Sequence, residues 1–288
     1  MIKTSNLSFT YPNAQAPAIN SLELELEQGK IHCLLGANGS GKTTLLCLLA
    51  GLFNNFSGTL EILDANLPSD AQANTWQEPN LNKLEHLEKP DKSGGLTQPS
   101  KPTSRPNLAQ LRQLRKLAAY VPQNPDVYLL GSTLEEDLFL GLTKKNAQAP
   151  ETKERAALLL QELGLAGLEH EPLQTLSFGQ RRKTCLASAL LGQPQILLLD
   201  EPFAGLDWQA SLHLREILIT NRNLGVTQII TVHDLDLLAD LADNFVLLQK
   251  GTLLASGNAQ SVFPKLFAGN VRPPCWWLEG KTSPPFLS

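Results

Sequence analysis

Short runs of large apolar residues, separated by glycine, proline and polar turn residues, recur along this chain. Three of them, at Ile31–Leu35, Gln195–Leu199 and Gln228–Val232, have the length of strands and are dominated by apolar side chains. Such runs are typical of strands that are buried on both faces of a sheet. Residues Leu22 to Leu26 instead alternate apolar and polar, which indicates a strand with one exposed face. The pattern therefore predicts an α/β fold with a buried central sheet and a more exposed β part.

Helical segments are expected from Glu154 to Leu163, from Gln180 to Leu191, and from Leu108 onward, where a helix leads into a strand. The segment from Asn66 to Asn107 differs from everything around it. It is rich in Pro, Ser, Lys, Asn and Gln and contains no Val, Ile, Phe or Tyr. Because such a segment buries too little apolar surface to offset its ordering entropy, we expect a disordered insertion.

Composition narrows the functional classes. The chain has 288 residues, a hydrophobic content of 42% and a net charge of −4, which argues against nucleic acid as its main partner. We find no signal peptide at the N-terminus and no stretch near the roughly 18 apolar residues of a membrane span. The four cysteines form no C-x-x-C pair, so buried, reduced thiols are expected rather than disulfides or a zinc site. These are Cys33, Cys47, Cys185 and Cys275.

Directly after the first buried run, residues 36–43 read GANGSGKT. A strand, a glycine-rich turn and a helix start, with lysine and threonine at the end, form the context of a P-loop. Glycines let consecutive N–H groups point at phosphate oxygens, and the helix adds its positive dipole end. We predict that Lys42 binds the β- and γ-phosphates of a nucleoside triphosphate and that Thr43 ligates Mg²⁺. The expected nucleotide-binding residues are Gly36, Ala37, Asn38, Gly39, Ser40, Gly41, Lys42, Thr43 and Thr44.

An acidic pair, Asp200 and Glu201, follows the second buried run. The carboxyl ends of parallel strands are the usual place for chemistry in such sheets. Asp200 is expected to hold Mg²⁺ and Glu201 to orient or deprotonate the attacking water. On its own, an Asp-Glu pair after a strand is as often the polar start of a loop as a catalytic site. The P-loop upstream favours the catalytic interpretation.

A third motif, Leu176-Ser177-Phe178-Gly179-Gln180, resembles the LSGGQ signature of ATP-binding cassette (ABC) ATPases, with Phe178 in place of the second glycine. Four more positions resemble marks of this family, in its order. They are Tyr11 (adenine-stacking aromatic), Gln123 (Q-loop), Asp207 in Ala204-Gly205-Leu206-Asp207 (D-loop) and His233 (switch histidine). A purely structural role is an alternative for Tyr11, which could pack beside Phe9 in an edge strand.

The resemblance implies the fold and the roles. It implies a P-loop NTPase (RecA-like) core with a mixed sheet, an antiparallel β subdomain and an ABC-type helical subdomain, in a single domain over 2–262. The parts would be 2–65 with 108–123, the helical subdomain 124–192 and the Walker B part 193–262, followed by a C-terminal tail, 263–288. It also implies catalytic roles for Glu201, His233 and Gln123, with Gln123 joining Thr43 and Asp200 at Mg²⁺. Ser177, Phe178, Gly179, Gln180 and Asp207 would contact ATP held by a second cassette.

Beyond the Q-loop, Gln123-Asn124-Pro125-Asp126 and Thr133-Leu134-Glu135-Glu136-Asp137 resemble the ATPases of energy-coupling factor (ECF) transporters. Phe178 and the run after His233 are most similar to the cobalt and nickel branch. This implies a homodimer or heterodimer of cassettes, a transmembrane scaffold and a substrate-binding membrane subunit, with the chain peripheral on the cytoplasmic face of the membrane. The alternatives are a vitamin-type ECF importer, a non-transport ABC ATPase, a regulatory cassette without hydrolysis, and a small-molecule P-loop kinase, which lacks the signature and D-loop.

Overall fold

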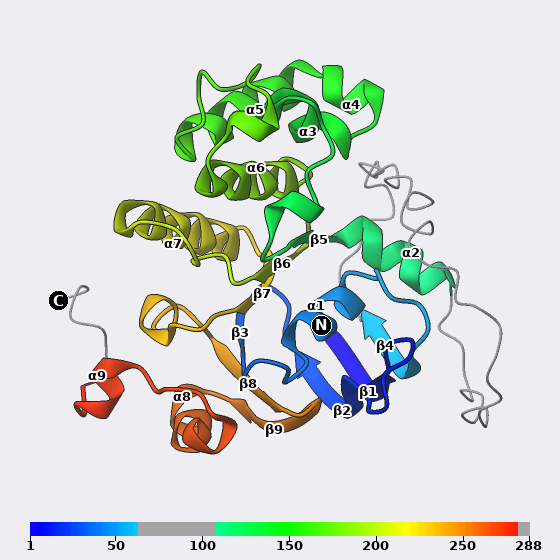
Figure 1. The fold of residues 1–288 in the computed structure, drawn as a ribbon, viewed down its shortest axis with the longest axis vertical. Coiled ribbons are helices and arrows are strands. Elements are labelled where there is room, and N and C mark those ends of the chain that lie inside the picture. Colours follow the sequence, from blue (N-terminus) through cyan, green and yellow to red (C-terminus); the bar gives the residue numbers. More distant parts are fainter. Residues whose placement is uncertain (63–107, 282–288) are drawn as a thin grey trace.

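The structure, a computed structural model, describes residues 1–62 and 108–281 (Figure 1). The expected insertion, 66–107, lies outside the described residues, as does the end of the chain, 282–288. The strands are β1 (Ile2–Phe9), β2 (Ile19–Leu26), β3 (Ile31–Leu35), β4 (Ser57–Ile62), β5 (Ala118–Val121), β6 (Ile196–Asp200), β7 (Thr227–Thr231), β8 (Asn244–Gln249) and β9 (Thr252–Gly257).

These strands form two sheets. The central sheet runs in the order β5-β6-β7-β3-β8-β9, with parallel neighbours except for the antiparallel pair β8–β9 at one edge. The second sheet, β2-β1-β4, is antiparallel. A mixed central sheet beside a separate antiparallel sheet confirms the fold class that the sequence predicts.

The helices form layers around the central sheet. Figure 1 shows α3 to α6 gathered beyond the β5–β6 side, with α7 between them and the sheet, and α1 on the side of the antiparallel sheet. The helices are α1 (Lys42–Leu49), α2 (Leu108–Leu117), α3 (Leu134–Leu140), α4 (Lys144–Gln148), α5 (Pro150–Glu162), α6 (Phe178–Leu191), α7 (Trp208–Asn223), α8 (Ala259–Val262) and α9 (Cys275–Leu278). The three helical segments expected from the sequence correspond to α2, α5 and α6, although α5 ends at Glu162, one residue before the expected end.

The core explains why the central strands read as continuous apolar runs. In β6, Leu197 and Leu199 pack into a cluster with α6 and α7, whereas Ile196 and Leu198 pack into a second cluster with α1 and the antiparallel sheet. Successive side chains of a strand point to opposite faces, and here both faces are covered. All five residues of β6, including Asp200, are therefore buried.

The residues after 262, expected to be a tail, pack against the main body as far as Trp277. Phe263 lies against Phe245 in β8 and against Trp277, with ring centroids 4.8 and 5.0 Å apart. Trp276 is 5% exposed and belongs to the larger core cluster. A backbone N–H of this segment, that of Cys275, donates to Asp236 Oδ1 at 2.9 Å.

Two further expectations can be compared with the described residues. The four cysteines are free thiols, three of them buried and Cys275 half-buried. In the described part of the chain, no helix combines the length and apolar character needed to cross a membrane.

Candidate nucleotide and catalytic site

The loop between β3 and α1 requires its glycines. Gly36 has φ +148°, and a Cβ there would lie 2.4 Å from the carbonyl oxygen of Leu248. Gly41 has φ +103°, and a Cβ there would lie 2.6 Å from the Ala18 carbonyl oxygen. Both positions combine a left-handed backbone with close approach of another main chain, which only glycine tolerates. This loop, called the cradle below, is thus packed tightly against the main chains of Leu248 and Ala18.

The start of α1 is open to an anion. Gly41 is its N-cap, and no side chain caps the helix. The first amides of a helix lack internal partners and carry the positive end of its dipole, so they bind phosphate readily. Ser40 contributes a second feature: its Oγ is buried and has no hydrogen-bond partner among the described residues. Both observations fit a phosphate group in this loop.

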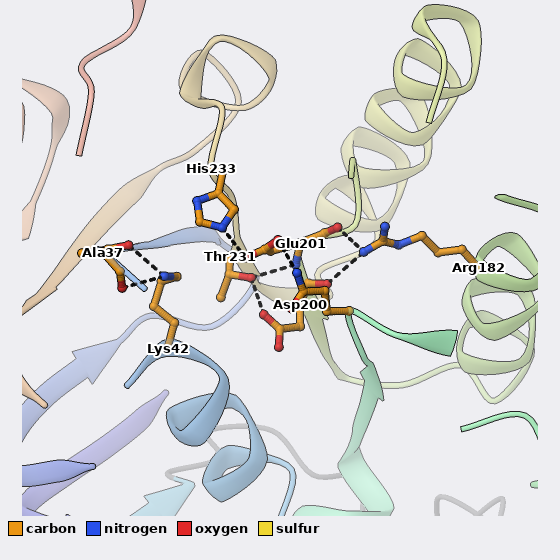
Figure 2. A network of polar contacts seen from close by, with 9 residues as sticks. Ala37, Lys42, Arg182, Asp200, Glu201, Thr231 and His233 are labelled. Atoms are coloured by element: carbon orange, nitrogen blue, oxygen red, sulfur yellow. Dashed lines mark hydrogen bonds and ion pairs between the residues drawn. The ribbon is translucent and has the colours of Figure 1, made fainter. Parts of the chain in front are cut away.

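Lys42 is folded back over the loop. Its Nζ donates to the carbonyl oxygens of Gly36 at 2.8 Å and Ala37 at 3.2 Å. Burial lowers the pKa of Lys42, an effect opposed by the nearby carboxylates of Glu201 and Asp200. Figure 2 shows the lysine on one side of the acidic pair. A cation is thereby held between the cradle and the carboxylates, where phosphate charge would lie.

Asp200 ends β6 in a fully enclosed position, with 2% of its surface exposed. Its Oδ1 accepts a hydrogen bond from the Thr231 hydroxyl at 2.6 Å, and its Oδ2 accepts one from the Tyr120 hydroxyl at 3.4 Å. Thr231 ends β7 and Tyr120 lies in β5, the strands on either side of β6. The aspartate is therefore held in one orientation by both neighbouring strands.

Glu201 brings the three expected catalytic residues together. Gln123 Nε2 donates to its Oε2 at 2.8 Å, and His233 Nε2 lies 2.6 Å from its Oε1. The three residues follow β5, β6 and β7, which are adjacent and parallel, so the carboxyl ends of these strands meet at one edge. Glu201 also has φ +51°, a left-handed conformation that is uncommon outside glycine and is often found at functional sites.

Two polar residues that the sequence analysis missed hold the backbone of this pair. Thr231 Oγ1 accepts from the Glu201 N–H at 2.7 Å, in addition to its bond to Asp200. Arg182, from α6, donates to the backbone carbonyls of Asp200, Glu201 and Ala204. Thr231 lies two residues before His233 at the same sheet edge, a position that would have identified it. Arg182 has no such local signal.

The donor set that the sequence analysis expects for Mg²⁺ would consist of oxygens: the Thr43 hydroxyl, the Gln123 amide oxygen and the Asp200 carboxylate. This is the ligand type that Mg²⁺ prefers, together with water and substrate phosphates. Asp200 is oriented by Thr231 and Tyr120, as the ligands of metal sites commonly are. Gln123 donates through its nitrogen, so its oxygen remains available. These residues fit the ion.

The expected signature residues lie elsewhere, at the start of α6. Ser177 is the N-cap: its Oγ accepts from the Gln180 N–H at 3.2 Å, while Gln180 Oε1 accepts from the Ser177 N–H at 2.8 Å. This reciprocal pair is a capping box. Phe178 is 44% exposed, and nothing lies within 4 Å of where a Cβ of Gly179 would be. Across the described residues, no hydrogen bond or ion pair joins 177–180 to the P-loop.

Asp207 and Tyr11 each have a structural contact. Asp207 caps α7, its Oδ1 accepting from the Ala210 N–H at 2.8 Å. Tyr11 lies edge-on to Phe9, with ring centroids 4.9 Å apart, as the alternative interpretation expects. Its hydroxyl also lies 3.0 Å from Thr44 Oγ1 in α1, and the residue is 40% exposed. An accessible aromatic side chain is thus fixed beside the P-loop helix.

The cradle, the lysine and the paired carboxylates at the sheet edge define a P-loop nucleoside triphosphatase. The family model of the ABC transporter matches residues 19–204, which is more than half of the chain. The chain belongs to the ABC transporter family, as its ATP-binding cassette. It is an ATPase whose hydrolysis of ATP is coupled to transport.

Some relatives and solved structures have more specific names. The nickel import ATP-binding protein NikO of Rhodobacter capsulatus is 34% identical over 252 residues, which cover 86% of each chain. The structure of CbiO1 from Clostridium perfringens, part of the ABC transporter complex CbiONQ, is 26% identical, with a TM-score of 0.62 and coverage of 92% of this chain and 90% of that one. A dimeric bacterial ABC transporter cassette has a TM-score of 0.65 at 22% identity, covering 90% of this chain and 98% of that one, which supports the fold alone.

Proposed function

We propose that this chain is the Mg²⁺-dependent ATP-hydrolysing subunit of an energy-coupling factor type importer, with a cobalt or nickel ion as the transported solute. One observation carries the catalytic part: Glu201 is contacted by both Gln123 and His233 beside a P-loop. A carboxylate held between an amide donor and an imidazole is suited to orient and polarise a water molecule. In this proposal Glu201 polarises the attacking water and His233 contacts the γ-phosphate. Gln123 contacts both the water and the metal ion.

The P-loop residues would bind the phosphates of ATP. The backbone N–H groups of 36–44 and the ammonium of Lys42 supply positive charge, and catalysis of phosphoryl transfer rests mostly on such positioning and charge stabilisation. Mg²⁺, when bound by Thr43, Asp200 and Gln123, would neutralise charge that develops on the β- and γ-phosphates. Lys42 would exchange its two carbonyl partners for phosphate oxygens, because a charged acceptor gives a stronger hydrogen bond.

The signature residues would act on ATP that is bound to another cassette. The start of α6 has the free amides and dipole end of an anion site, and it lies on an exposed face of the chain. In the proposed dimer, Ser177, Phe178, Gly179 and Gln180 face the γ-phosphate held by the second P-loop, and Asp207 lies at the same interface. Tyr11 would stack on the adenine, using the ring face that remains accessible.

The importer type rests on the loop and helix that follow Gln123. Asn124 caps the turn at Pro125–Val127, and Asp126 forms an ion pair with Arg181 at 2.8 Å. Asp137, buried in α3, accepts from the N–H groups of Leu130 and Gly131 at 2.8 and 3.1 Å. The residues that resemble ECF ATPases thus hold this loop and helix together. The similarity to NikO and CbiO1 is the second support for the proposed importer type.

A pull-down with uptake measurements tests this proposal. The tagged chain, expressed with the membrane proteins encoded beside its gene, is expected to co-purify with a transmembrane scaffold and a second cassette. Cells carrying the complex should take up radiolabelled Ni²⁺ or Co²⁺, and Glu201→Gln should abolish the uptake. Uptake of a labelled vitamin instead, or an ATPase that never associates with a membrane protein, would contradict the proposed importer.

A further inference from the structure

Arg182 is a buried charge that the catalytic scheme does not use. It lies one turn into α6 and is 3% exposed. Its Nη1 donates to the Ala204 carbonyl, and its Nη2 donates to the carbonyls of Glu201 and, at 3.4 Å, of Asp200. Figure 2 shows its guanidinium reaching from the helix to the segment that carries the acidic pair. All three acceptors are main-chain oxygens of one short segment.

That segment is the one whose conformation decides where the Glu201 carboxylate lies. Glu201 adopts φ +51°, and its carbonyl also accepts from the Ala204 N–H at 3.2 Å. On the other side, the Glu201 N–H donates to Thr231 at 2.7 Å. The unusual backbone is therefore held from both ends, by a threonine of β7 and by an arginine of α6. Strained residues at functional sites persist only where their surroundings fix them in this way.

Stability alone is a weak reason to bury this charge. Burial lowers the pKa of Arg182, which reflects the unfavourable transfer of its charge from water, while Glu201 and Asp200 attract it. Even a buried ion pair can often be replaced as a unit by well-packed apolar residues without loss of stability. A planar group with several fixed donors has another advantage, since it holds several acceptors in one geometry.

The same arginine contacts the expected signature and D-loop. Its guanidinium carbon lies 5.9 Å from the ring centroid of Phe178, one helical turn earlier. The Phe178 ring lies 3.6 Å from where a Cβ of Gly205 would be. The start of α6, Arg182 and the segment from Asp200 to Gly205 therefore form one continuous packed unit, so a displacement of α6 is carried to Glu201.

We propose that Arg182 is a positioning residue that fixes the backbone of Glu201 and so links hydrolysis to the placement of the signature helix in the same chain. The inference rests on the proposed role of Glu201. Removal of the guanidinium should leave the P-loop intact, because among the described residues no hydrogen bond or ion pair joins Arg182 to residues 36–44. It should allow the Glu201 carboxylate to leave its place between Gln123 and His233.

The test uses Arg182→Met, which retains an apolar stem, in the assembled complex with its full complement of subunits. Turnover should fall by about 10- to 100-fold, as expected when a reacting group is misplaced by about an ångström, with the KM for ATP within about twofold of wild type. Arg182→Lys keeps the positive charge but replaces the planar guanidinium with a single ammonium group, so it should show an intermediate loss of turnover. Arg215→Met is the matched control: Arg215 is an equally buried arginine, which pairs with Asp240 at 2.6 Å, away from Glu201. It should lower the melting temperature without a comparable loss of turnover.

A double-mutant cycle separates positioning from general damage. In a Glu201→Gln background, measured by single-turnover hydrolysis of radiolabelled ATP, Arg182→Met should change the rate by less than about twofold, because residues that act as a unit are not additive. Full multiplication of the two losses, or wild-type turnover of Arg182→Met, would overturn the inference while leaving Glu201 in its role. Near-normal turnover of Glu201→Gln alone would instead overturn the proposed function. If Arg182→Met does not fold, the Arg182→Lys variant decides: wild-type turnover refutes the inference, and a loss at unchanged KM supports it.

Discussion

The region around Glu201 and the start of α6 differ in how many of their polar groups have partners elsewhere in the chain. Around Glu201, side chains from three strands and one helix meet, and every polar group of the acidic pair has a partner from a different element. At the start of α6, the side chains of Ser177 and Gln180 are paired only with each other's backbone N–H groups. Phe178 and Gly179 lie at an open surface. The first region is satisfied by contacts within the chain, whereas we propose that the second is one side of an interface.

This difference shows what a single chain of an ABC ATPase contains. The proposed water-handling residues, the phosphate cradle and the proposed metal ligands can be assembled by one sheet edge. The N-terminus of α6 can also bind phosphate, but in the part of the chain that the structure describes no hydrogen bond or ion pair joins it to the P-loop of its own chain. The phosphate would therefore have to be held by a second cassette. The following predictions probe the two regions separately, and their effects should differ in kind as well as in size.

The largest effect is expected at Glu201. Glu201→Gln removes the negative charge that orients and polarises water, so turnover should fall by about 10²- to 10⁴-fold, the range for a general base. Binding of a fluorescent ATP analogue should be retained, and the ATP-bound dimer should accumulate on gel filtration. Turnover within a few-fold of wild type would remove Glu201 from the mechanism.

Lys42→Ala should act on binding. The lysine is expected to donate charge-assisted hydrogen bonds to phosphate, and their loss should weaken ATP affinity by about 10- to 100-fold. Isothermal titration with ATP and Mg²⁺ measures this directly, with Thr43→Ala as a companion. The threonine variant should lose affinity mainly when Mg²⁺ is present. Unchanged ATP affinity for Lys42→Ala would show that its carbonyl contacts are only structural.

A smaller effect, and one confined to the assembled dimer, is expected at Ser177. Ser177→Ala removes the N-cap of α6, which should lower stability by about 1 kcal/mol. Turnover should fall about 10-fold through loss of the hydroxyl that contacts the opposite phosphate, with ATP binding to the single chain unchanged. Thr133→Ala, which removes the equivalent cap of α3, is the control. It should lose similar stability and keep its turnover; equal loss of turnover in both would assign Ser177 to capping alone.

The smallest effect is expected at Phe178. The ring is half exposed and packs against Gly205 and Arg182, which keeps its three carbonyl partners without it. Phe178→Ala should therefore change turnover by less than about threefold, as most exposed substitutions do. A large gain in ATPase activity would mean that the ring obstructs the facing phosphate.

The sequence was sufficient for the parts of the site that depend on local spacing. The P-loop follows from glycine, lysine and threonine between a strand and a helix. The roles of Gln123 and His233 were implied by the resemblance to ABC ATPases, whereas Glu201 was expected from its place at the end of a buried strand. The three residues meet because they follow β5, β6 and β7, whose carboxyl ends share an edge. Their meeting requires only that β5, β6 and β7 are parallel neighbours in the sheet.

Arg182 and the residues after 262 needed the tertiary structure. Arg182 stands beside Arg181 and Lys183 in a basic run at the start of a helix, and nothing local distinguishes the one that is buried. Trp276 lies in a segment with two neighbouring prolines that resembles a tail. It packs against Phe263, which in turn packs against Phe245, a residue of β8. Expectations for residues 66–107 concern a part of the chain that lies outside the described residues.

The central claim is that each complete site takes its P-loop from one cassette and its signature from the other. The most direct measurement pairs two inactive variants, Lys42→Ala and Ser177→Arg, carried on chains with different tags. Mixed dimers isolated through both tags contain one intact site out of two, so about half of the wild-type ATPase activity should return, as a two-fold symmetric interface requires. Neither variant alone should be active. If the doubly tagged dimers are as inactive as their parents, the signature does not act across the interface, and the account is contradicted.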